Sequence, residues 1–420
     1  MSQEPIRIAI VGGGLAGAAI ANALVHLPHL EIHVFESSPD FSERGAAIGL
    51  AGNAQRALQQ FIPSAMDLLN RAGAVPIQSA RVMMGAGVDT GTFVCDLGEG
   101  EEPDPNPPLI VSRASLLREL LKPLPREALH ADRQVDSIQE TSDGVEITFR
   151  DDQTVSFDGL IGADGIFGTV RQYVVEKDEC TATSTGFWDC RNVIPFDQAV
   201  AAFGDEYFKV DREYGWVGDG TFFLHNVIEN KTMVQCLMSG VEKEPHSSRV
   251  QVLTREILEE KLQGSSDSPM TKKMVDILLD QPRTEAYSSY EHKRTSTYAK
   301  GRICIAGDAA HAMSPWQGAG GGQAIEDAMI LGSLLSEISS SAETGAAFRA
   351  LDAVRRPRAQ RIIDSSRETG QIMCGQNIDV GLNKDKIKQA VASKWSFILG
   401  LDMARHKEDA VRQMRQDQNK

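Results

Sequence analysis

The sequence predicts an α/β fold in which one α/β domain is assembled from separated pieces of the chain and a second, mainly β domain is inserted between them. Three observations support this fold class. The chain opens with a strand–turn–helix–strand unit, a strand after residue 300 runs into a glycine-rich loop and a long helix, and the segment between them is rich in aromatic residues and paired strands. At roughly 150 residues per domain, 420 residues accommodate two or three domains.

The opening unit combines an apolar, β-rich run (Ile6–Val11), a glycine turn, a small-residue helix from about Ala16 to Val25 and a second strand (Glu31–Phe35). The turn has the sequence Gly12-Gly13-Gly14-Leu15-Ala16-Gly17, a G-x-G-x-x-G pattern. In this pattern the first glycine permits a tight turn, the second lets the backbone approach a pyrophosphate, and the third lets the helix pack on the strand.

An acidic residue follows this turn at the spacing that a dinucleotide site needs. Glu36 lies 19 residues after Gly17, at the end of the second strand, where a carboxylate can accept hydrogen bonds from a ribose. The N–H groups at the start of the helix can meet phosphates. The strand, the turn, the helix and the spaced acid together predict a dinucleotide-binding site.

The middle of the chain alternates between the two expected domains. Ser112 is expected to cap an amphipathic helix, and short strands are expected at Val135–Ile138, Val145–Arg150, Thr154–Phe157 and Leu160–Ala163. In the inserted part, Phe222–Ile228 and Met233–Met238 are expected to pair around a turn. The expected boundaries are residues 1–75, 106–178 and 285–370 for the nucleotide-binding domain, 76–105 and 179–284 for the inserted substrate domain, and 371–420 for a C-terminal helical segment.

Two later motifs also place ligand-binding residues at strand ends. An apolar strand runs into Ala163-Asp164-Gly165, with Arg171 following. A second strand ends at Gly307-Asp308, and Pro315-Trp316-Gln317-Gly318-Ala319-Gly320-Gly321-Gly322 then leads into a helix. Asp308 is placed to bind ligand hydroxyls, while the glycine N–H groups and the helix N-terminus can stabilise negative charge on an electron-rich ring.

Composition excludes several other classes of protein. The 43 Lys and Arg against 58 Asp and Glu give a net charge of −15, which argues against nucleic-acid binding. The six cysteines form no C-x-x-C pair or zinc-ligand spacing, so we expect reduced thiols and no metal site. The uncharged stretch from Ile8 to Val25 is interrupted by the glycine turn, so we expect no membrane span and a cytoplasmic protein.

Together, the three motifs resemble those of the single-component FAD-dependent aromatic hydroxylases (class A flavoprotein monooxygenases), above all the salicylate-hydroxylase-like branch. The resemblance covers roughly residues 5 to 370. It is also carried by Arg44-Gly45-Ala46-Ala47-Ile48, by Arg113 with Leu116 and Leu117, by Tyr214-Gly215-Trp216 and by Arg355-Arg356-Pro357-Arg358.

The resemblance implies a Rossmann-like domain that binds FAD non-covalently. Gly12, Gly14 and Gly17, with Leu15 and Ala16, would hold the pyrophosphate, and Glu36 the adenosine ribose. Arg44 and Arg113 would contact the phosphate and ribityl region beside Ala47, and Asp164 and Gly165 would contribute to FAD and NAD(P)H binding. Asp308 would bind the ribityl chain, and Pro315, Gly318, Gly320 and Gly321 would line the isoalloxazine ring.

The resemblance further implies that NAD(P)H reduces the flavin and that O₂ then hydroxylates a phenolic, salicylate-like ring. A carboxyl group at the attacked carbon could leave as CO₂. His225 alternates with Phe223 and Val227 on one strand face, and a histidine facing the pocket could deprotonate a phenol. A half-exposed sheet histidine is the competing interpretation.

Other candidate substrate-pocket residues are Trp216, Tyr214 and Trp316, while Pro315 is grouped with His225 as a catalytic candidate. Tyr214 and Trp216 could equally fill the core. Arg191 could pair with a substrate carboxylate or simply be exposed. Where related enzymes often have a smaller or polar residue, this chain has Trp316.

Several alternatives stay open at the level of sequence. A polyketide phenol, with plain or dearomatising hydroxylation, is compatible with the motifs, as are a reductase on the same fold and a non-catalytic FAD-binding protein. A halogenase should have Trp-x-Trp-x-Ile-Pro, but Trp188 is followed by Asp189-Cys190-Arg191. The sequence does not determine whether NADH or NADPH is used or which phenol is the substrate. It also does not determine whether the protein is a monomer or a homodimer.

Overall fold

A parallel sheet forms the centre of one half of the molecule. The computed structural model describes residues 4–42, 47–97, 106–242, 248–262 and 268–418. Within them, a six-stranded sheet is parallel except for one edge pair. Its order is β19 (Ala299–Lys300), β20 (Ile303–Ile305), β12 (Gly159–Gly162), β1 (Ile6–Val11), β2 (Leu30–Phe35) and β8 (Leu129–His130).

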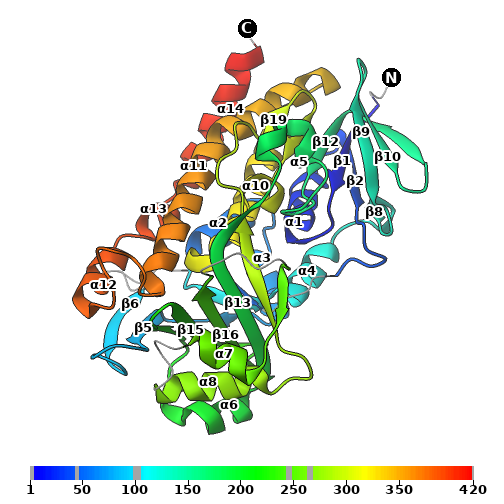
Figure 1. Cartoon of the computed structure of the whole chain (residues 1–420). Helices are drawn as coiled ribbons and strands as arrows, with labels where there is room; N and C mark the ends of the chain where they lie inside the picture. The colour runs from blue at the N-terminus through cyan, green and yellow to red at the C-terminus, as the bar shows by residue number, and fades with distance from the viewer. Residues whose placement is uncertain (1–3, 43–46, 98–105, 243–247, 263–267, 419–420) are drawn as a thin grey trace.

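Both faces of this sheet are covered, as the apolar run of β1 requires. Ile8 and Ile10 pack with residues of four helices on one face, and Ala9 and Val11 face an antiparallel meander on the other (Figure 1). The helices are α1 (Leu15–Leu24), α10 (Gly320–Leu335), α11 (Thr344–Met373) and α14 (Met403–Gln418), and the meander comprises β9 (Val135–Glu140), β10 (Val145–Phe149) and β11 (Thr154–Phe157). The predicted opening unit and meander are confirmed.

Smaller elements complete this half. Ser112 caps α4 as predicted, because its Oγ accepts a hydrogen bond from the N–H of Ser115 (3.4 Å). The remaining elements are β3 (Ala47–Leu50), β4 (Val75–Pro76), β7 (Leu109–Ser112), α2 (Gly52–Gln59), α3 (Ala65–Arg71), α4 (Arg113–Leu121), α5 (Arg171–Val174) and α9 (Asp308–His311).

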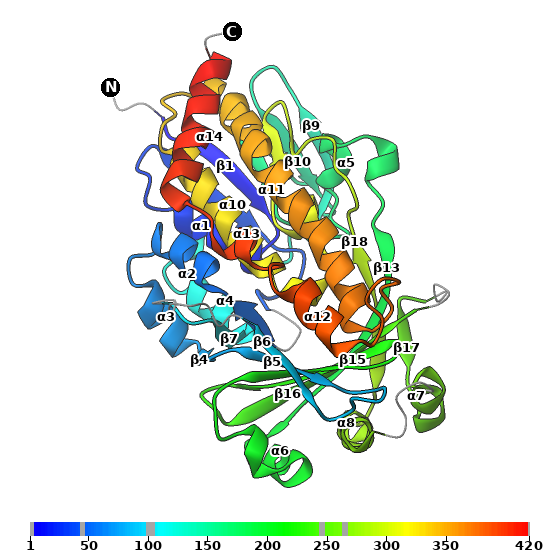
Figure 2. The ribbon, with the colours of Figure 1, turned by 90° about the vertical axis from the view of Figure 1, so that its left-hand side faces the viewer.

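An eight-stranded sheet forms the other half of the molecule. Apart from the parallel pair β14–β5, its strands are antiparallel. Its order is β17 (Val250–Val252), β18 (Glu285–Glu291), β13 (Thr183–Pro195), β16 (Met233–Val241), β15 (Thr221–Ile228), β14 (Glu213–Val217), β5 (Ala80–Met84) and β6 (Phe93–Leu97). Helices α6 (Phe196–Phe203), α7 (Arg255–Lys261) and α8 (Pro269–Leu279) cover its outer side (Figure 2).

One expected domain boundary needs a correction. Strand β18 (Glu285–Glu291) pairs with β13, so the inserted sheet continues to residue 291 and does not end at residue 284. The C-terminal segment 371–420 packs against both halves of the molecule. Ala410 and Met414 of α14 join the core around α1 and α10, and Ile387 and Val391 of α12 (Lys384–Val391) pack with β5 and β6.

Among the described residues, no helix is both long and apolar enough to cross a membrane.

A buried network of charges joins α9, α10 and α11. Glu326 and Asp327 on α10 both bind Arg355 of α11, at 2.6 and 2.7 Å. Asp327 also accepts hydrogen bonds from His311 Nε2 (2.7 Å) and from the N–H of Gly307 (2.9 Å). Burial alone would raise the pKa of Asp327, but the contacts with His311 and Arg355 lower it to about 2. The network therefore holds the strand end and the helix start in one arrangement.

We expect Arg355→Met to lower the free energy of unfolding by about 3–5 kcal/mol, because it leaves two buried carboxylates without their main partner. The neighbouring Arg356 pairs with Asp352 near the surface, so Arg356→Met should cost about 1 kcal/mol or less. Urea unfolding of both variants measures the difference. Equal losses of unfolding free energy in the two variants would contradict the assignment of Arg355 as the main partner of the buried carboxylates.

Candidate active site

A cavity of about 830 Å³ lies between the two halves. On one side it is lined by the carboxyl ends of β1, β2 and β12, the place where open α/β sheets bind ligands. On the other side it is lined by one face of the eight-stranded sheet. The cavity therefore brings the predicted dinucleotide motifs and the inserted domain together.

The glycine turn leaves the start of α1 open to this cavity. Gly12, Gly14, Leu15 and Ala16 line it, and the first residue before the helix provides no side-chain cap. Gly12 has φ +111°, and a Cβ atom there would lie 2.2 Å from the carbonyl oxygen of Ala163. Gly17 does not line the cavity. A Cβ atom on it would lie 1.9 Å from the carbonyl oxygen of Gly12, so this glycine serves close packing of helix and turn.

Glu36 lines the cavity at the end of β2, and local donors fix its carboxylate. Its Oε2 accepts a hydrogen bond from the N–H of Gly13 (2.8 Å), and its Oε1 accepts one from the N–H of Ser38 (2.8 Å). Oε1 also accepts a hydrogen bond from the hydroxyl of Ser37 (3.2 Å), and Oε2 can accept a further bond. The group is thus held in place beside the open turn, where it can bind a ligand hydroxyl.

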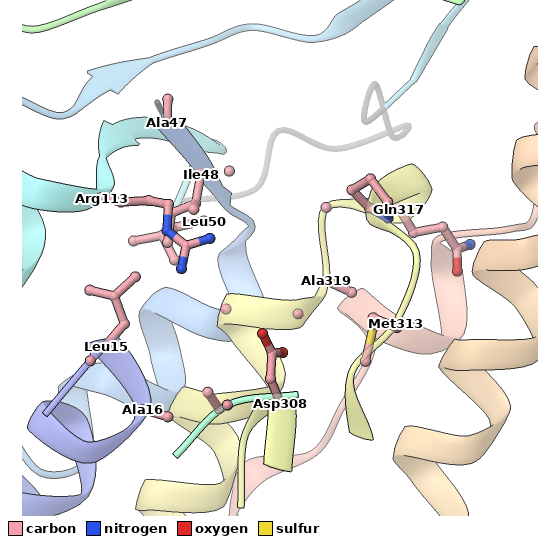
Figure 3. Close-up of a pocket in the computed structure, with 18 of the residues that line it drawn as sticks. Leu15, Ala16, Ala47, Ile48, Leu50, Arg113, Asp308, Met313, Gln317 and Ala319 are labelled. Carbon is pink, nitrogen blue, oxygen red and sulfur yellow. The ribbon is translucent and has the colours of Figure 1, made fainter. Parts of the chain in front are cut away.

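A second open helix end faces the same cavity. The residue before α10, Ala319, provides no side-chain cap, and Gly318, Gly320 and Gly321 line the cavity around it. Figure 3 shows Asp308 pointing toward this space from below the loop, with Arg113 reaching in from the side of α4. The cavity is therefore bordered by two helix N-termini and by side chains of both charges.

The other predicted cofactor residues also line the cavity where the structure describes them. Asp164 accepts a hydrogen bond from the N–H of Val170 (3.0 Å), and burial raises the pKa of its carboxyl. Arg44 lies outside the described residues. The lining residues of this group are Ala47, Arg113, Asp164, Gly165, Asp308 and Pro315.

On its central strands β14, β15 and β16, the wall formed by the eight-stranded sheet presents alternate residues to the cavity. Leu224 of β15 lies opposite Leu237 of β16 and Gly215 of β14, so the centre of the wall is apolar. Polar groups stand at its two sides. The wall comprises Ala80, Arg81, Val82, Leu97, Asp189, Arg191, Glu213, Gly215, Phe222, Leu224, Asn226, Gln235, Leu237 and Ser239.

His225, Tyr214 and Trp216 lie on the other face of this sheet, so the expectation that they line the pocket is wrong. The His225 ring stacks between Phe203 (4.7 Å between ring centroids) and Tyr214 (5.2 Å) under the outer helices. It is 1% exposed, and burial lowers its pKa to about 3. Trp216 belongs to the same core. The predicted alternation is correct, but this set of residues faces the helices.

On the cavity side, a row of hydrogen bonds joins the sheet to β3. The N–H of Ala47 donates to Gln235 Oε1 (2.9 Å), and Gln235 Nε2 donates to Asn226 Oδ1 (3.4 Å). Asn226 Nδ2 donates to Glu213 Oε2 (2.8 Å). No sequence motif indicated these residues, although Asn226 directly follows His225 on β15 and therefore points to the opposite face of the sheet.

The far side of the wall carries an ion pair. Arg191 donates to Asp189 Oδ2 (2.8 Å), and both residues lie two positions apart on β13, facing the cavity. Burial raises the pKa of the Asp189 carboxyl, while Arg191 lowers it. Arg191 is therefore already paired with an acid of this chain.

Trp316 lines the cavity and packs against two aromatic rings and a glycine of α11. Its ring meets Phe187 and Phe222 edge-on, at 5.0 and 5.5 Å. A Cβ atom on Gly370 of α11 would lie 2.4 Å from Trp316 Nε1, so that helix makes room for the indole.

The C-terminal segment also contributes to the cavity, which no motif had indicated. Trp395 and Leu399 line it, and Gln317 is bound from both sides. Gln317 Nε2 donates to the carbonyl oxygen of Lys394 (2.9 Å), and Trp395 Nε1 donates to the carbonyl oxygen of Gln317 (3.3 Å). The segment thus supports the loop before α10.

Comparison with known proteins now gives the family. The model of the FAD binding domain family (FAD_binding_3) matches residues 6–366. The chain is a member of this family. It is 30% identical to 6-methylsalicylate 1-monooxygenase of Aspergillus terreus, over 97% of this chain and 92% of that protein. It is 29% identical to an FAD-dependent monooxygenase of Gibberella moniliformis, over 100% and 99%.

Two solved structures share the fold over nearly the whole chain. Salicylate hydroxylase in its substrate complex gives a TM-score of 0.83 at 22% identity, covering 98% of this chain and 99% of that one. CtdE with FAD and substrate gives 0.83 at 17% identity, covering 99% and 100%. The predicted family, the FAD cofactor and the enzyme class are confirmed: the protein is an FAD-dependent monooxygenase.

The residues around the cavity fit FAD. The open start of α1 and the turn at Gly12 suit the pyrophosphate, because a side chain at Gly12 would collide with the neighbouring strand end. Glu36 and Asp308 offer carboxylates for hydroxyl groups of the ribose and the ribityl chain. The open start of α10 suits the electron-rich edge of the flavin ring.

We expect Gly12→Ala to raise the dissociation constant of FAD by about tenfold or more, because the added methyl group forces the turn away from Ala163. FAD content after gel filtration and flavin fluorescence measure this change. Gly91→Ala is the matched control, since Gly91 also has positive φ (+84°) but nothing lies within 4 Å of its added Cβ atom. Equal losses in both variants would contradict the interpretation.

The position of His225 predicts a pH-dependent stability. Its folded-state pKa of about 3 lies below the ordinary 6.5, so below pH 6.5 the unfolded chain binds the extra proton and stability falls. Relative to the natural chain, we expect the free energy of unfolding of His225→Phe to rise by about 2 kcal/mol between pH 7 and pH 5. Urea unfolding at both values checks this. A difference that is independent of pH would contradict it.

Proposed function

We propose that this monooxygenase hydroxylates a phenolic aromatic ring, using NAD(P)H and O₂. The observation that carries the proposal is the two-sided cavity. On its flavin side lies the open N-terminus of α10, and its sheet side has an apolar centre around Leu224 and Leu237 with polar groups at both sides. Such a wall suits a planar ring with hydroxyl substituents.

The names of the relatives agree with this assignment. One is a 6-methylsalicylate monooxygenase, and the fold is shared with a salicylate hydroxylase. When bound, FAD supplies the chemistry that couples oxidation of NAD(P)H to activation of O₂. NAD(P)H would act as a transient co-substrate.

The chain's own groups would orient the reactants and limit water. Asp308 and the loop from Pro315 to Gly321 would position the flavin, and the N–H groups at the start of α10 would stabilise negative charge on its ring. Trp316, Trp395 and Leu399 would shield the reaction from solvent. Loss of CO₂ would follow where the substrate carries a carboxyl group at the attacked carbon.

A panel of salicylate, 6-methylsalicylate and orcinol tests the proposal. With at least one of them, we expect stimulated NAD(P)H oxidation, O₂ uptake and a product that contains one oxygen atom from O₂, with loss of CO₂ where the attacked carbon carried a carboxyl group. Hydrogen peroxide is measured in parallel to detect uncoupled turnover. A flavin-containing protein that oxidises NAD(P)H with none of the phenols would contradict the proposal.

We expect Asp308→Ala to lower FAD content and activity together, by about tenfold or more, because a ligand-facing carboxylate at the strand end is removed. Asp205→Ala, at an exposed carboxylate on the far side of the inserted domain, is the control. Retention of full FAD content and activity by the Asp308 variant would show that the site is wrongly assigned.

A further inference from the structure

We propose that Glu213 binds the aromatic hydroxyl of the substrate, and that the row from Ala47 through Gln235 and Asn226 fixes it as a hydrogen-bond acceptor. The inference deepens the proposed function and rests on it. It concerns how the site selects its substrate: the ligand must present an O–H donor to this side of the sheet wall.

The direction of the row is fixed from both ends. The backbone N–H of Ala47 can only donate, so Gln235 must turn its oxygen toward Ala47 and its NH₂ group toward Asn226. Asn226 then turns its own NH₂ group toward Glu213. The carboxylate oxygen of Glu213 accepts the hydrogen bond at that end. One orientation of the two side-chain amides therefore satisfies all three hydrogen bonds of the row.

The end of the row faces the cavity. Glu213, Asn226 and Gln235 all line it, and the single bond from Asn226 uses only one of the several acceptor positions of a carboxylate. A ligand hydroxyl can occupy another. Neither an ether oxygen nor a second carboxylate can donate to this group, so the site discriminates by hydrogen-bond polarity.

The surroundings make Glu213 a strong acceptor. Burial raises the pKa of its carboxyl, and the hydrogen bond from Asn226 lowers it, with burial dominant. A more basic carboxylate forms a stronger hydrogen bond to a phenol. Such a bond also increases the electron density of the ring, which favours attack by an electrophilic oxygen. Glu213 would thus bind the phenol hydroxyl from the face of the sheet opposite to His225.

The row also joins the substrate wall to the flavin side. Ala47 belongs to β3, and Figure 3 shows it above Ile48 at the edge of the cavity, across from the loop that carries Ala319. Because Gln235 is bonded to its backbone, the position of Glu213 is tied to the strand that borders the cofactor.

The test compares a hydroxyl with its methyl ether in the FAD-loaded protein. Orcinol and 6-methylsalicylate are each titrated against their O-methyl ethers, and dissociation constants are taken from the change in flavin absorbance. We expect the natural chain to prefer the hydroxyl member about tenfold or more, as a hydrogen bond to a charged group predicts. Glu213→Ala should reduce the preference to about threefold or less.

Glu213→Gln provides a nearly isosteric second variant. A glutamine can accept from Asn226 through its oxygen and then presents an NH₂ group to the cavity, so the preference for the hydroxyl should be lost or reversed. Glu206→Gln, at an exposed glutamate of the inserted domain, is the matched control and should keep the preference. Flavin content and melting temperature confirm that each variant is folded.

The outcomes separate the two proposals. Unchanged discrimination in both Glu213 variants, or no binding of either phenol to the natural chain, overturns the role of Glu213. The preference for the hydroxyl over the methyl ether could depend on Glu213 in a protein that never oxidises NAD(P)H. That result supports the role of Glu213 and contradicts the proposed function. Turnover by Glu213 variants at unchanged KM for the phenol also overturns the assignment.

Discussion

The buried carboxylates Glu326 and Asp327 and the guanidinium group of Arg355 are the constraint on which the site depends. All three side chains are nearly inaccessible to solvent, so each charge is stable only while its partners are in place. Asp327 also binds the N–H of Gly307, immediately before Asp308. One ion network therefore fixes the chain that follows β20 relative to α10 and α11.

The same network extends to the C-terminal part of the chain. Arg358 binds Glu326 and donates to the carbonyl oxygens of Phe397 and Ile398, at 3.0 and 2.9 Å. This holds the segment that carries Trp395, whose indole N–H in turn bonds to the loop before α10. Segments distant in sequence thus share one set of charges, and the C-terminal segment becomes part of the cavity wall.

The two faces of the eight-stranded sheet have different environments. Behind it, His225 and Trp216 fill an aromatic core under α6 and α8, where burial keeps the histidine uncharged. In front, Glu213 and Asn226 are hydrogen-bonded in the cavity. Neighbouring residues on one strand therefore have opposite roles, because a strand turns successive side chains to opposite faces.

The local motifs were sufficient to predict the cofactor half. A glycine turn between a strand and a helix, Glu36 at the next strand end and a glycine-rich start of α10 each create their environment from nearby residues, so their place could be inferred from order and spacing. The sequence alone likewise determined the alternation on β15. The sequence could not determine which of the two sets of side chains on β15 faces the cavity. The two faces of a strand differ only after other elements pack against one of them. Only tertiary packing decided that: α6 and α8 cover the side of His225, and the flavin-binding half leaves Asn226 and Glu213 facing the cavity.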